Sequence, residues 1–106
     1  MQKVTEANYD EIVNQASVPV VLDFGATWCG PCKKLEPIIE ELGQEKNGTM
    51  IVAKIDVGEA PSIAQKFGVM GVPTVIFLKD GQPVHQFTGV VSKDKISQML
   101  SQHLGV

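Results

Sequence analysis

Residues 18–46 read VPVVLDFGATWCGPCKKLEPIIEELGQEK, and this stretch decides the fold. Its first part, residues 18–24, is apolar on both faces except at Asp23, which predicts a β-strand in the centre of a sheet. Its last part has the composition of a helix. Cys29 and Cys32, the only cysteines of the chain, lie between these two elements. The stretch therefore predicts a strand–loop–helix unit that holds two thiols within one helical turn.

The segments on either side alternate between helix and strand. We expect a helix from Thr5 to about Ala16, the cysteine-containing helix to about Lys46, a strand at 49–55, a helix at 59–67, strands at 73–79 and 83–88 around an Asp80-Gly81 turn, and a helix capped by Ser92. This order predicts an α/β fold in which helices cover both faces of a mixed sheet. A length of 106 residues matches one domain, so we expect a single domain over residues 1–106.

The charge and composition of the chain limit its partners. A formal net charge of -3 and the absence of arginine argue against a nucleic-acid or anionic-membrane partner, because both need clustered basic residues. No apolar run reaches the length of about 18 residues that a membrane-spanning helix needs. Residues Met1–Glu6 lack the apolar stretch of a signal peptide, which favours a cytoplasmic location. In a reducing compartment a lone cysteine pair is more often catalytic or metal-binding than structural.

Three uses of the cysteine pair are open from the residues alone. A structural disulfide between Cys29 and Cys32 would close such a short loop that it contributes only about 2 kcal/mol. A zinc site would need two further ligands, and only His85 and His103 remain, on a predicted strand and a predicted helix. Reversible exchange between a dithiol and a disulfide needs no further group. We therefore favour two-electron redox chemistry without a metal or another cofactor.

The position of Cys29 at the start of a helix favours its thiolate, because unpaired N–H groups and the helix dipole stabilise a negative sulfur. Lowering a thiol pKa from about 8.5 to about 7 raises the thiolate fraction about 15-fold and lowers its nucleophilicity about fivefold. Positioning of the target disulfide must therefore supply most of the rate. We expect Cys29 to attack a substrate disulfide and Cys32 to resolve the mixed disulfide. The uncharged Gly30-Pro31 pair between them favours a reductant over an oxidase or isomerase.

Several motifs resemble the thioredoxin family in their order and spacing. They are Asp23-Phe24, Trp28-Cys29-Gly30-Pro31-Cys32-Lys33, Pro37, Lys54, Gly71-Val72-Pro73-Thr74 and Gly89. The resemblance implies a thioredoxin fold, with a five-stranded sheet of order 1-3-2-4-5 and four flanking helices. It also implies a monomeric protein-disulfide reductase, an electron carrier in cell redox homeostasis that thioredoxin reductase, an NADPH-dependent flavoprotein, recharges. One departure is Gly25, where the family usually carries an aromatic residue, so we expect weaker packing near the active-site loop.

Two charged residues of the predicted strands are candidates for acid–base chemistry. If Asp23 is buried among its apolar neighbours, its pKa should be raised and it could take a proton, whereas a place at the strand end would expose it. The resemblance implies that Asp23 is the general base for Cys32. Lys54 interrupts another apolar strand, where it either extends to the surface or, as the resemblance implies, pairs with Asp23. We interpret the acidic face of the cysteine-containing helix as solvated surface; it comprises Glu36, Glu40, Glu41 and Glu45.

Substrate contacts are expected around the cysteine pair. From the sequence alone Pro73 fits the start of a strand, and the resemblance implies a cis bond between Val72 and Pro73. The Val72 backbone could then pair with an extended substrate segment. Trp28 is either a core residue or part of an exposed apolar patch that marks a contact site. The expected substrate-binding residues are Trp28, Gly30, Pro31, Gly71, Val72, Pro73, Gly89 and Val90.

Three functions compete at this point. The leading one is a general reductase of disulfides in protein substrates. An oxidase or isomerase on the same fold agrees less well with the uncharged Gly30-Pro31 pair and with the missing export signal. A non-catalytic interaction subunit would use the apolar patch alone and would not need the intact cysteine pair.

Overall fold

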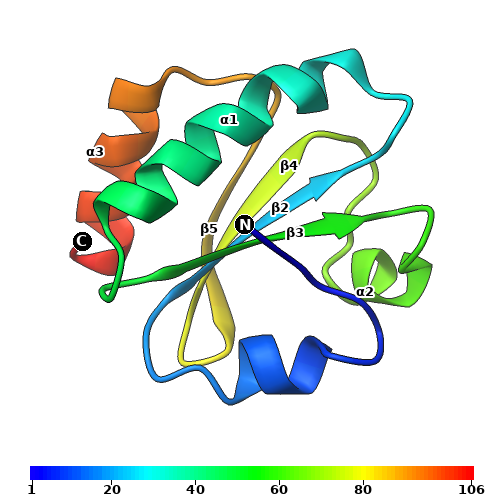
Figure 1. Ribbon diagram of the computed structural model, residues 1–106, viewed down its shortest axis with the longest axis horizontal. Coiled ribbons are helices and arrows are strands. Elements are labelled where there is room, and N and C mark those ends of the chain that lie inside the picture. Colours follow the sequence, from blue (N-terminus) through cyan, green and yellow to red (C-terminus); the bar gives the residue numbers. More distant parts are fainter.

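The apolar stretch after Pro19 forms the central strand of the sheet. In the computed structural model, which describes residues 1–106, this strand is β2 (Val20–Gly25). It pairs in parallel with β3 (Ile51–Asp56) and antiparallel with β4 (Thr74–Lys79). The outer strands are β1 (Gln2–Lys3) and β5 (Gln82–Thr88). The order β1-β3-β2-β4-β5 confirms the mixed sheet that the sequence predicts and the five-stranded order that its resemblance implies (Figure 1).

Helical segments flank this sheet on both sides. They are η1 (Asp10–Asn14), α1 (Gly30–Glu45), α2 (Pro61–Lys66) and α3 (Lys93–Leu104). Figure 1 shows α1 and α3 on one side of the sheet, with α2 and the medium-blue η1 on the other. The predicted cap of α3 is confirmed, since the Ser92 side chain accepts a hydrogen bond from the Lys95 N–H at 3.2 Å. The helices thus enclose the sheet as the alternating sequence predicts.

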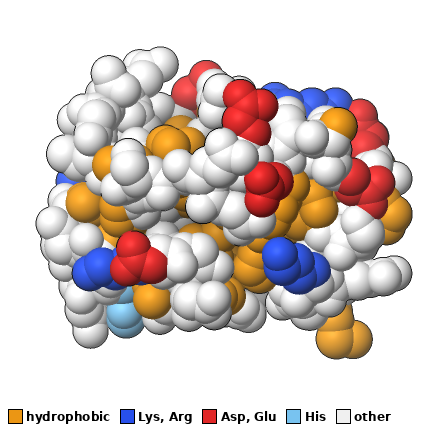
Figure 2. Space-filling model, turned by 90° about the horizontal axis from the view of Figure 1, so that it is seen from below, with side chains coloured by type: hydrophobic (Ala, Val, Ile, Leu, Met, Phe, Trp, Pro, Cys, Tyr) orange, Lys and Arg blue, Asp and Glu red, His pale blue; other side chains and the backbone are white.

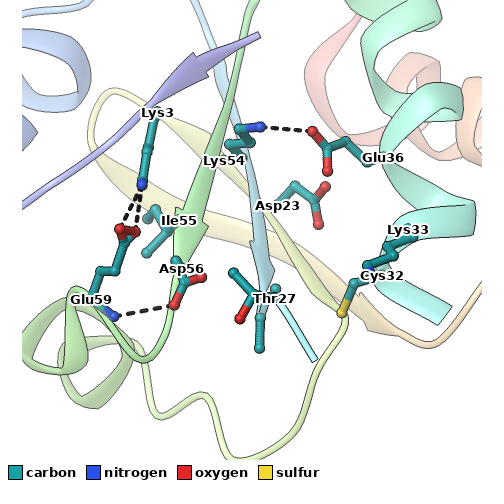
Figure 3. Close-up of a pocket in the computed structure, with 12 residues that line it drawn as sticks. Lys3, Asp23, Thr27, Cys32, Lys33, Glu36, Lys54, Ile55, Asp56 and Glu59 are labelled. Carbon is teal, nitrogen blue, oxygen red and sulfur yellow. Dashed lines mark hydrogen bonds and ion pairs between the residues drawn. The ribbon is translucent and has the colours of Figure 1, made fainter. Parts of the chain in front are cut away.

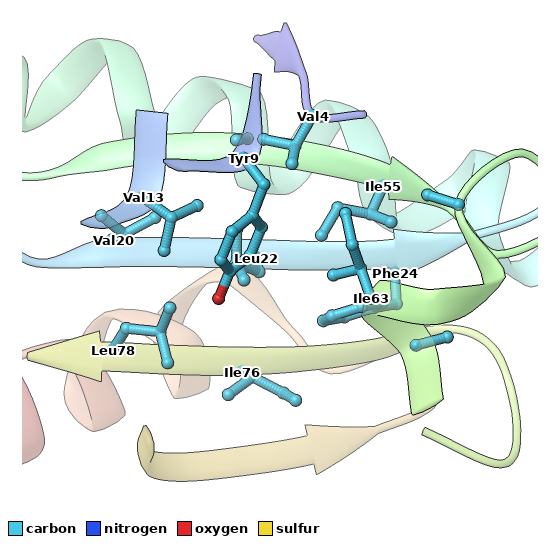
Figure 4. Close-up of a cluster of buried hydrophobic side chains, with 13 residues drawn as sticks. Val4, Tyr9, Val13, Val20, Leu22, Phe24, Ile55, Ile63, Ile76 and Leu78 are labelled. Atoms are coloured by element: carbon cyan, nitrogen blue, oxygen red, sulfur yellow. The ribbon is translucent and has the colours of Figure 1, made fainter. Parts of the chain in front are cut away.

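Alternation along the central strand divides the core into two halves. Val20, Leu22 and Phe24 face η1 and α2, and they belong to the 13-residue cluster of buried side chains in Figure 4. Val21 faces the other way, into a second cluster of 10 residues under α1 and α3. Because side chains alternate along a strand, Asp23 shares the face of Val21. The fold therefore places a carboxyl group beneath α1, where Asp23 is only 4% exposed.

The strand register brings the functional loops to one end of the sheet. The residues in register at this end are Phe24, Ile55, Thr74 and Thr88, one from each of β2, β3, β4 and β5. The loops that follow β2, β3 and β5 therefore leave the sheet where the loop before β4 enters it. As a result, the cysteine loop, the loop that ends at Pro73, and Gly89 share one end of the molecule.

The first helix differs from the expected α-helix between Thr5 and Ala16. Only the short η1 forms there, and its hydrogen bonding is π-helical, since the Gln15 N–H donates to the Asp10 carbonyl oxygen at 3.0 Å. Asn8 organises the entry to η1, because its side-chain oxygen accepts from the Thr5 N–H at 2.7 Å. The predicted Thr5 cap is therefore wrong. Polar side chains that bond to nearby backbone compete with regular helix, and a hydrophobic pattern does not register that competition.

The helix expected at 59–67 is confirmed, but it begins later, at Pro61. The Asp56 carboxylate accepts the N–H groups of Gly58 at 2.8 Å and Glu59 at 3.1 Å, which forms a turn before the helix. Pro61 then starts α2, where the missing proline N–H needs no partner.

The two edges of the sheet are short or irregular. β1 has only 2 residues. β5 contains Pro83, and the pairing register of β4 with β5 shifts between Phe77 and Leu78. The hairpin between these strands turns at Asp80-Gly81, as predicted, with positive φ at both residues.

Charged side chains tie α1 to other elements. Lys93 of α3 donates to Glu41 at 2.8 Å and also to Glu45, and the N-terminal ammonium of Met1 donates to Glu40 at 2.9 Å. The acidic face of α1 is thus more than solvated surface. Figure 2 shows one face of the molecule, on which acidic and basic groups are interspersed among apolar side chains. None of the helices combines the length and the apolar composition that crossing a bilayer demands.

Helix α1 lies close to β3 at Gly43. A Cβ atom at this position would overlap Cγ2 of Val52 and would lie 3.2 Å from its Cγ1. The absence of a side chain at Gly43 therefore sets how near α1 can lie to the sheet.

We expect the substitution Gly43→Ala to lower the free energy of unfolding by about 1–3 kcal/mol, because the added methyl must displace Val52. Urea denaturation measures this change. Helix propensity alone predicts a gain of about 1 kcal/mol, so a stabilised variant would contradict the packing argument. As a control, Gly43→Ala should cost much less in a Val52→Ala background, which lacks the overlapping methyl groups.

Candidate active site

Cys29 and Cys32 form a disulfide at the N-terminus of α1, with Cα atoms 5.3 Å apart. Cys29 is the N-cap residue, and its Sγ accepts a hydrogen bond from the Cys32 backbone N–H at 3.2 Å. Pro31 lies in the first turn, where its missing N–H leaves no acceptor unsatisfied. In the dithiol form the same N–H and the helix dipole favour a negative charge on Cys29. The geometry therefore supports the thiolate at position 29.

Two segments at the same end of the sheet as this disulfide are joined by one backbone hydrogen bond, and a side-chain hydrogen bond holds one of them. The Val72-Pro73 bond is cis, as the resemblance implies. The Gly89 N–H donates to the Pro73 carbonyl oxygen at 3.0 Å. The Thr74 hydroxyl donates to the Gly71 carbonyl oxygen at 2.7 Å. These contacts hold the expected substrate-binding backbone in a fixed arrangement at the end of the sheet.

Most of the expected substrate-binding residues are accessible. Trp28 is 78% exposed and Val90 is 48% exposed, so the alternative of Trp28 as a core residue is wrong. Gly30, Pro31 and Gly71 are exposed, Val72 and Gly89 are half-buried, and Pro73 is buried. Met70 is 100% exposed, and the sequence analysis missed it. Its position directly before the Gly71-Val72-Pro73 motif is the signal that could have identified it.

Asp23 is buried without a compensating partner. Its Oδ1 atom has no hydrogen-bond partner. Burial is the largest of the effects that raise the pKa of Asp23 to about 7; the nearby negative charge of Glu36 also raises it, and Lys54 acts in the opposite direction. The raised pKa that we expect for a buried Asp23 is thus found. The alternative, in which Asp23 faces solvent, is wrong. A carboxyl group with such a pKa can exchange a proton near neutral pH.

Lys54 pairs with Glu36 and not with Asp23. It is the register partner of Asp23 in the neighbouring strand, yet its Nζ donates to Glu36 Oε1 at 2.8 Å (Figure 3). That hydrogen bond raises the pKa of Lys54. The expected direct pair with Asp23 is therefore absent, because the half-exposed Glu36 can meet the ammonium group with less desolvation than Asp23.

Glu36 is a second residue of this site, after Met70, that the sequence analysis missed. The sequence pattern places it on a solvated face, but its carboxylate accepts a hydrogen bond from Lys54 and its charge acts on the buried Asp23 (Figure 3). The available signal was its spacing, since Glu36 follows Cys32 by four positions and therefore lies one turn further along the same helix face.

A pocket of about 510 Å³ opens beside these groups. Residues of β1, β2, β3 and α1 line it, together with the segment that leads to the cysteines. Asp23, Cys32, Glu36 and Lys54 contribute to its wall (Figure 3). Gly25, which has no side chain, also lines the pocket. The pocket touches Cys32 but not Cys29.

The two histidines lie away from the cysteines and against each other. The rings of His85 and His103 stack with centroids 4.0 Å apart, and Nε2 of His85 is 3.2 Å from Sδ of Met99. Burial and the neighbouring His103 both lower the pKa of His85. The ligand set that the zinc alternative requires is therefore not brought together, because the cysteines bond to each other and the histidines stack on β5 and α3.

Comparison with known proteins agrees with this geometry. The thioredoxin family model matches residues 1–102. A thioredoxin of Staphylococcus haemolyticus is 47% identical over 102 residues, which cover 96% of each chain. Thioredoxins of Staphylococcus saprophyticus and Staphylococcus aureus are 45% and 46% identical over the same length and coverage.

The pKa of Asp23 makes the stability of the oxidised protein depend on pH. Between about pH 4 and pH 7 the folded protein holds a proton on Asp23 that the unfolded chain has released. Raising the pH in this window therefore lowers the free energy of unfolding, by about 1.4 kcal/mol per pH unit. We expect Asp23→Asn to lose this slope and to be more stable than the wild type at pH 8.

Urea denaturation of both oxidised proteins from pH 4.5 to pH 8 measures the difference. Other groups titrate in both proteins, so the difference curve isolates Asp23. A difference that stays constant with pH would show that Asp23 titrates as it does in the unfolded chain.

Proposed function

Because this chain belongs to the thioredoxin family, we propose that Cys29 and Cys32 take separate roles in the reduction of protein disulfides. The chain is a protein-disulfide oxidoreductase. The hydrogen bond from the Cys32 N–H to Cys29 Sγ carries the assignment of roles, since it stabilises negative charge on Cys29 alone. Cys29 is therefore the attacking thiolate and Cys32 the resolving thiol.

The cycle transfers two electrons to the substrate. The Cys29 thiolate attacks one sulfur of a substrate disulfide, so that a Cys29–substrate bond forms and the other substrate sulfur leaves as a thiolate. Cys32 then gives up its proton and attacks Cys29 Sγ. The Cys29–substrate bond breaks, the second substrate thiolate leaves, and the Cys29–Cys32 disulfide of the structure forms. A reductase must then return two electrons to this disulfide.

Cys32→Ser should stop the cycle after its first step. We expect the pre-reduced variant to attack a disulfide of intact insulin and to stay joined to one insulin chain by a stable mixed disulfide at Cys29, because no thiol remains to release it. Mass spectrometry of the non-reduced sample detects the adduct and its position. The matched variant Cys29→Ser should form no insulin adduct under the same conditions, and an adduct on Cys32 there would reverse the assigned roles.

Asp23 serves as the general base for Cys32 in this proposal. Both residues line one pocket, the Oδ1 atom of Asp23 is unpartnered, and its pKa of about 7 suits a base near neutral pH. Lys54 and Glu36 tune that base in opposite directions through their charges. The hydrogen bond between them keeps both charges close to the carboxyl group.

The release step should therefore accelerate as the pH rises through about 7. In Asp23→Asn this acceleration should be lost, because no carboxylate remains to take the Cys32 proton. In Glu36→Gln its midpoint should move to lower pH, since a charge that raises the pKa of Asp23 is removed. Stopped-flow release from a preformed mixed disulfide measures the profile. An unchanged profile in Asp23→Asn would remove the base role.

We propose that substrates bind to the exposed end of the sheet around the disulfide. The apolar side chains available there are Trp28, Met70 and Val90. The half-buried Val72 offers its backbone to an extended segment, in the manner of strand addition. Gly30, Pro31, Gly71, Pro73 and Gly89 shape this surface without charge. Recognition by backbone and shape accepts many partners, which supports a general reductase.

Family membership supports disulfide-containing substrates and recycling by a reductase. We propose that the recycling enzyme is the NADPH-dependent flavoprotein thioredoxin reductase. We further propose that residues 1–106 act as one monomeric thioredoxin domain in the cytoplasm. The uncharged Gly30-Pro31 pair supports this location, because it favours a reducing potential that suits a reducing compartment.

A further inference from the structure

Position 25 leaves one face of the resolving cysteine uncovered. A Cβ atom built on Gly25 would lie 3.4 Å from both Cβ and Sγ of Cys32, so any larger residue would cover this sulfur. Gly25 ends an ordinary strand, and its φ lies outside the left-handed region that only glycine adopts easily. The backbone therefore does not require glycine here. The consequence of a glycine at position 25 is the open space beside Cys32.

That space belongs to the pocket of about 510 Å³. A volume in this range fits a small molecule and not a folded partner. Cys32 is 7% exposed and lines the pocket, whereas Cys29 is 4% exposed and does not. The structure thus offers two approaches to one disulfide, which differ in the sulfur they reach.

The pocket also contains an unsatisfied polar group. Asp23 is only 4% exposed, and its Oδ1 atom lacks a hydrogen-bond partner. It lines the pocket together with Cys32. Figure 3 shows its carboxyl group on the α1 side, between Glu36 and Cys32. A ligand that donates a hydrogen bond would satisfy this acceptor, because a buried carboxyl oxygen without a partner is costly.

The charges of the lining favour a cationic ligand over an anionic one. The acidic residues of the pocket are Asp23, Glu36, Asp56 and Glu59, and its basic residues are Lys3, Lys33 and Lys54. Two basic groups are already paired, Lys3 with Glu59 and Lys54 with Glu36. Four acidic groups against three basic groups leave one acidic group in excess when Asp23 is ionised.

We propose that this pocket is a second entrance to the active site, through which a low-molecular-weight aminothiol or its disulfide exchanges directly with Cys32. The inference rests on the redox-active disulfide of the proposed function, but it does not depend on which cysteine attacks protein substrates. Protein disulfides meet Cys29 at the exposed end of the sheet. Small cationic thiols meet Cys32 from the side that Gly25 leaves open.

Reduction of the Cys29–Cys32 disulfide by this route consumes two small thiols. The first thiol loses its proton to Asp23 or to water, and its thiolate attacks Cys32 Sγ. A bond from the thiol sulfur to Cys32 forms, the Cys29–Cys32 bond breaks, and Cys29 leaves as a thiolate. A second thiolate attacks the small-molecule sulfur of this mixed disulfide. It releases the Cys32 thiolate and a small disulfide, so two thiols have supplied the two electrons that reduce the protein.

The test uses cystamine, the disulfide of a cationic aminothiol, on full-length variants that keep one cysteine. In Cys29→Ser the Cys32 thiolate attacks cystamine, forms a mixed disulfide and releases cysteamine, and mass spectrometry follows the adduct. Adding Gly25→Phe should slow this reaction about tenfold, because the ring fills the approach to the sulfur. The same Gly25→Phe in a Cys32→Ser background should leave the reaction of Cys29 unchanged.

Equal rates with and without Gly25→Phe at Cys32, or equal slowing at both cysteines, would overturn the proposal. If Gly25→Phe does not fold, Gly25→Ala should slow Cys32 in the same direction, since its Cβ contacts Cys32 Sγ. A series of small disulfides that differ in charge gives a second test on the same Cys29→Ser variant. Relative to a free cysteine peptide, Cys32 should react faster with cystamine than with a neutral or an anionic disulfide of the same length, and the reverse order would contradict the cationic site.

Reduction of insulin by the pre-reduced wild-type protein keeps the two proposals distinguishable. If insulin is not reduced, the proposed function fails. If insulin is reduced but Cys32 reacts with cystamine regardless of residue 25, only the second entrance fails.

Discussion

The contact between the first turn of α1 and the end of the central strand β2 is the constraint on which the chemistry depends. The buried face of α1, formed by Leu35, Ile39 and Leu42, packs into the cluster that contains Val21 of β2. Burial of these side chains fixes the helix relative to the sheet. The helix start, and with it the disulfide, is therefore held above Asp23. Neither a lowered thiol pKa nor a nearby base would be effective if this turn could move away from the strand.

The same contact gives the carboxyl group of Asp23 an environment that a sequence selected for stability alone would avoid. An ionised carboxylate without a hydrogen-bond partner is unfavourable inside a core, and Oδ1 of Asp23 has none. The apolar residue that would fit this position on β2 would stabilise the fold but could not accept a proton. The pair of Lys54 and Glu36 does not remove this cost, because the negative charge of Glu36 raises the pKa of Asp23 and outweighs the opposite effect of Lys54. Stability is thus reduced locally at the place where we propose that a proton is transferred.

The sequence predicts the sheet, its central strand and the disulfide because those features depend on local patterns. An apolar run predicts β2, a Ser92 cap predicts the start of α3, and the Cys29-Gly30-Pro31-Cys32 motif predicts the redox site. The role of Glu36 and the pairing of Lys54 depend on how α1 is rotated over β3, which no local pattern encodes. The π-helical η1 is not predicted for another reason: hydrogen bonds from side chains to the backbone, such as that between Asn8 and the Thr5 N–H, influence its shape. The pocket is visible only in three dimensions, because an absent side chain at Gly25 matters only through its distance to Cys32.

The irregular edges of the sheet have a consequence for the behaviour of the protein at high concentration. A long, flat edge strand invites pairing with another chain and is a route to aggregation. Here one edge is β1, with only 2 residues. The other edge is β5, where Pro83 lacks an N–H to donate and the pairing with β4 shifts register near Phe77. Trp28 and Met70, which we propose as partner contacts, are exposed, but neither sheet edge is suited to fibril-like stacking.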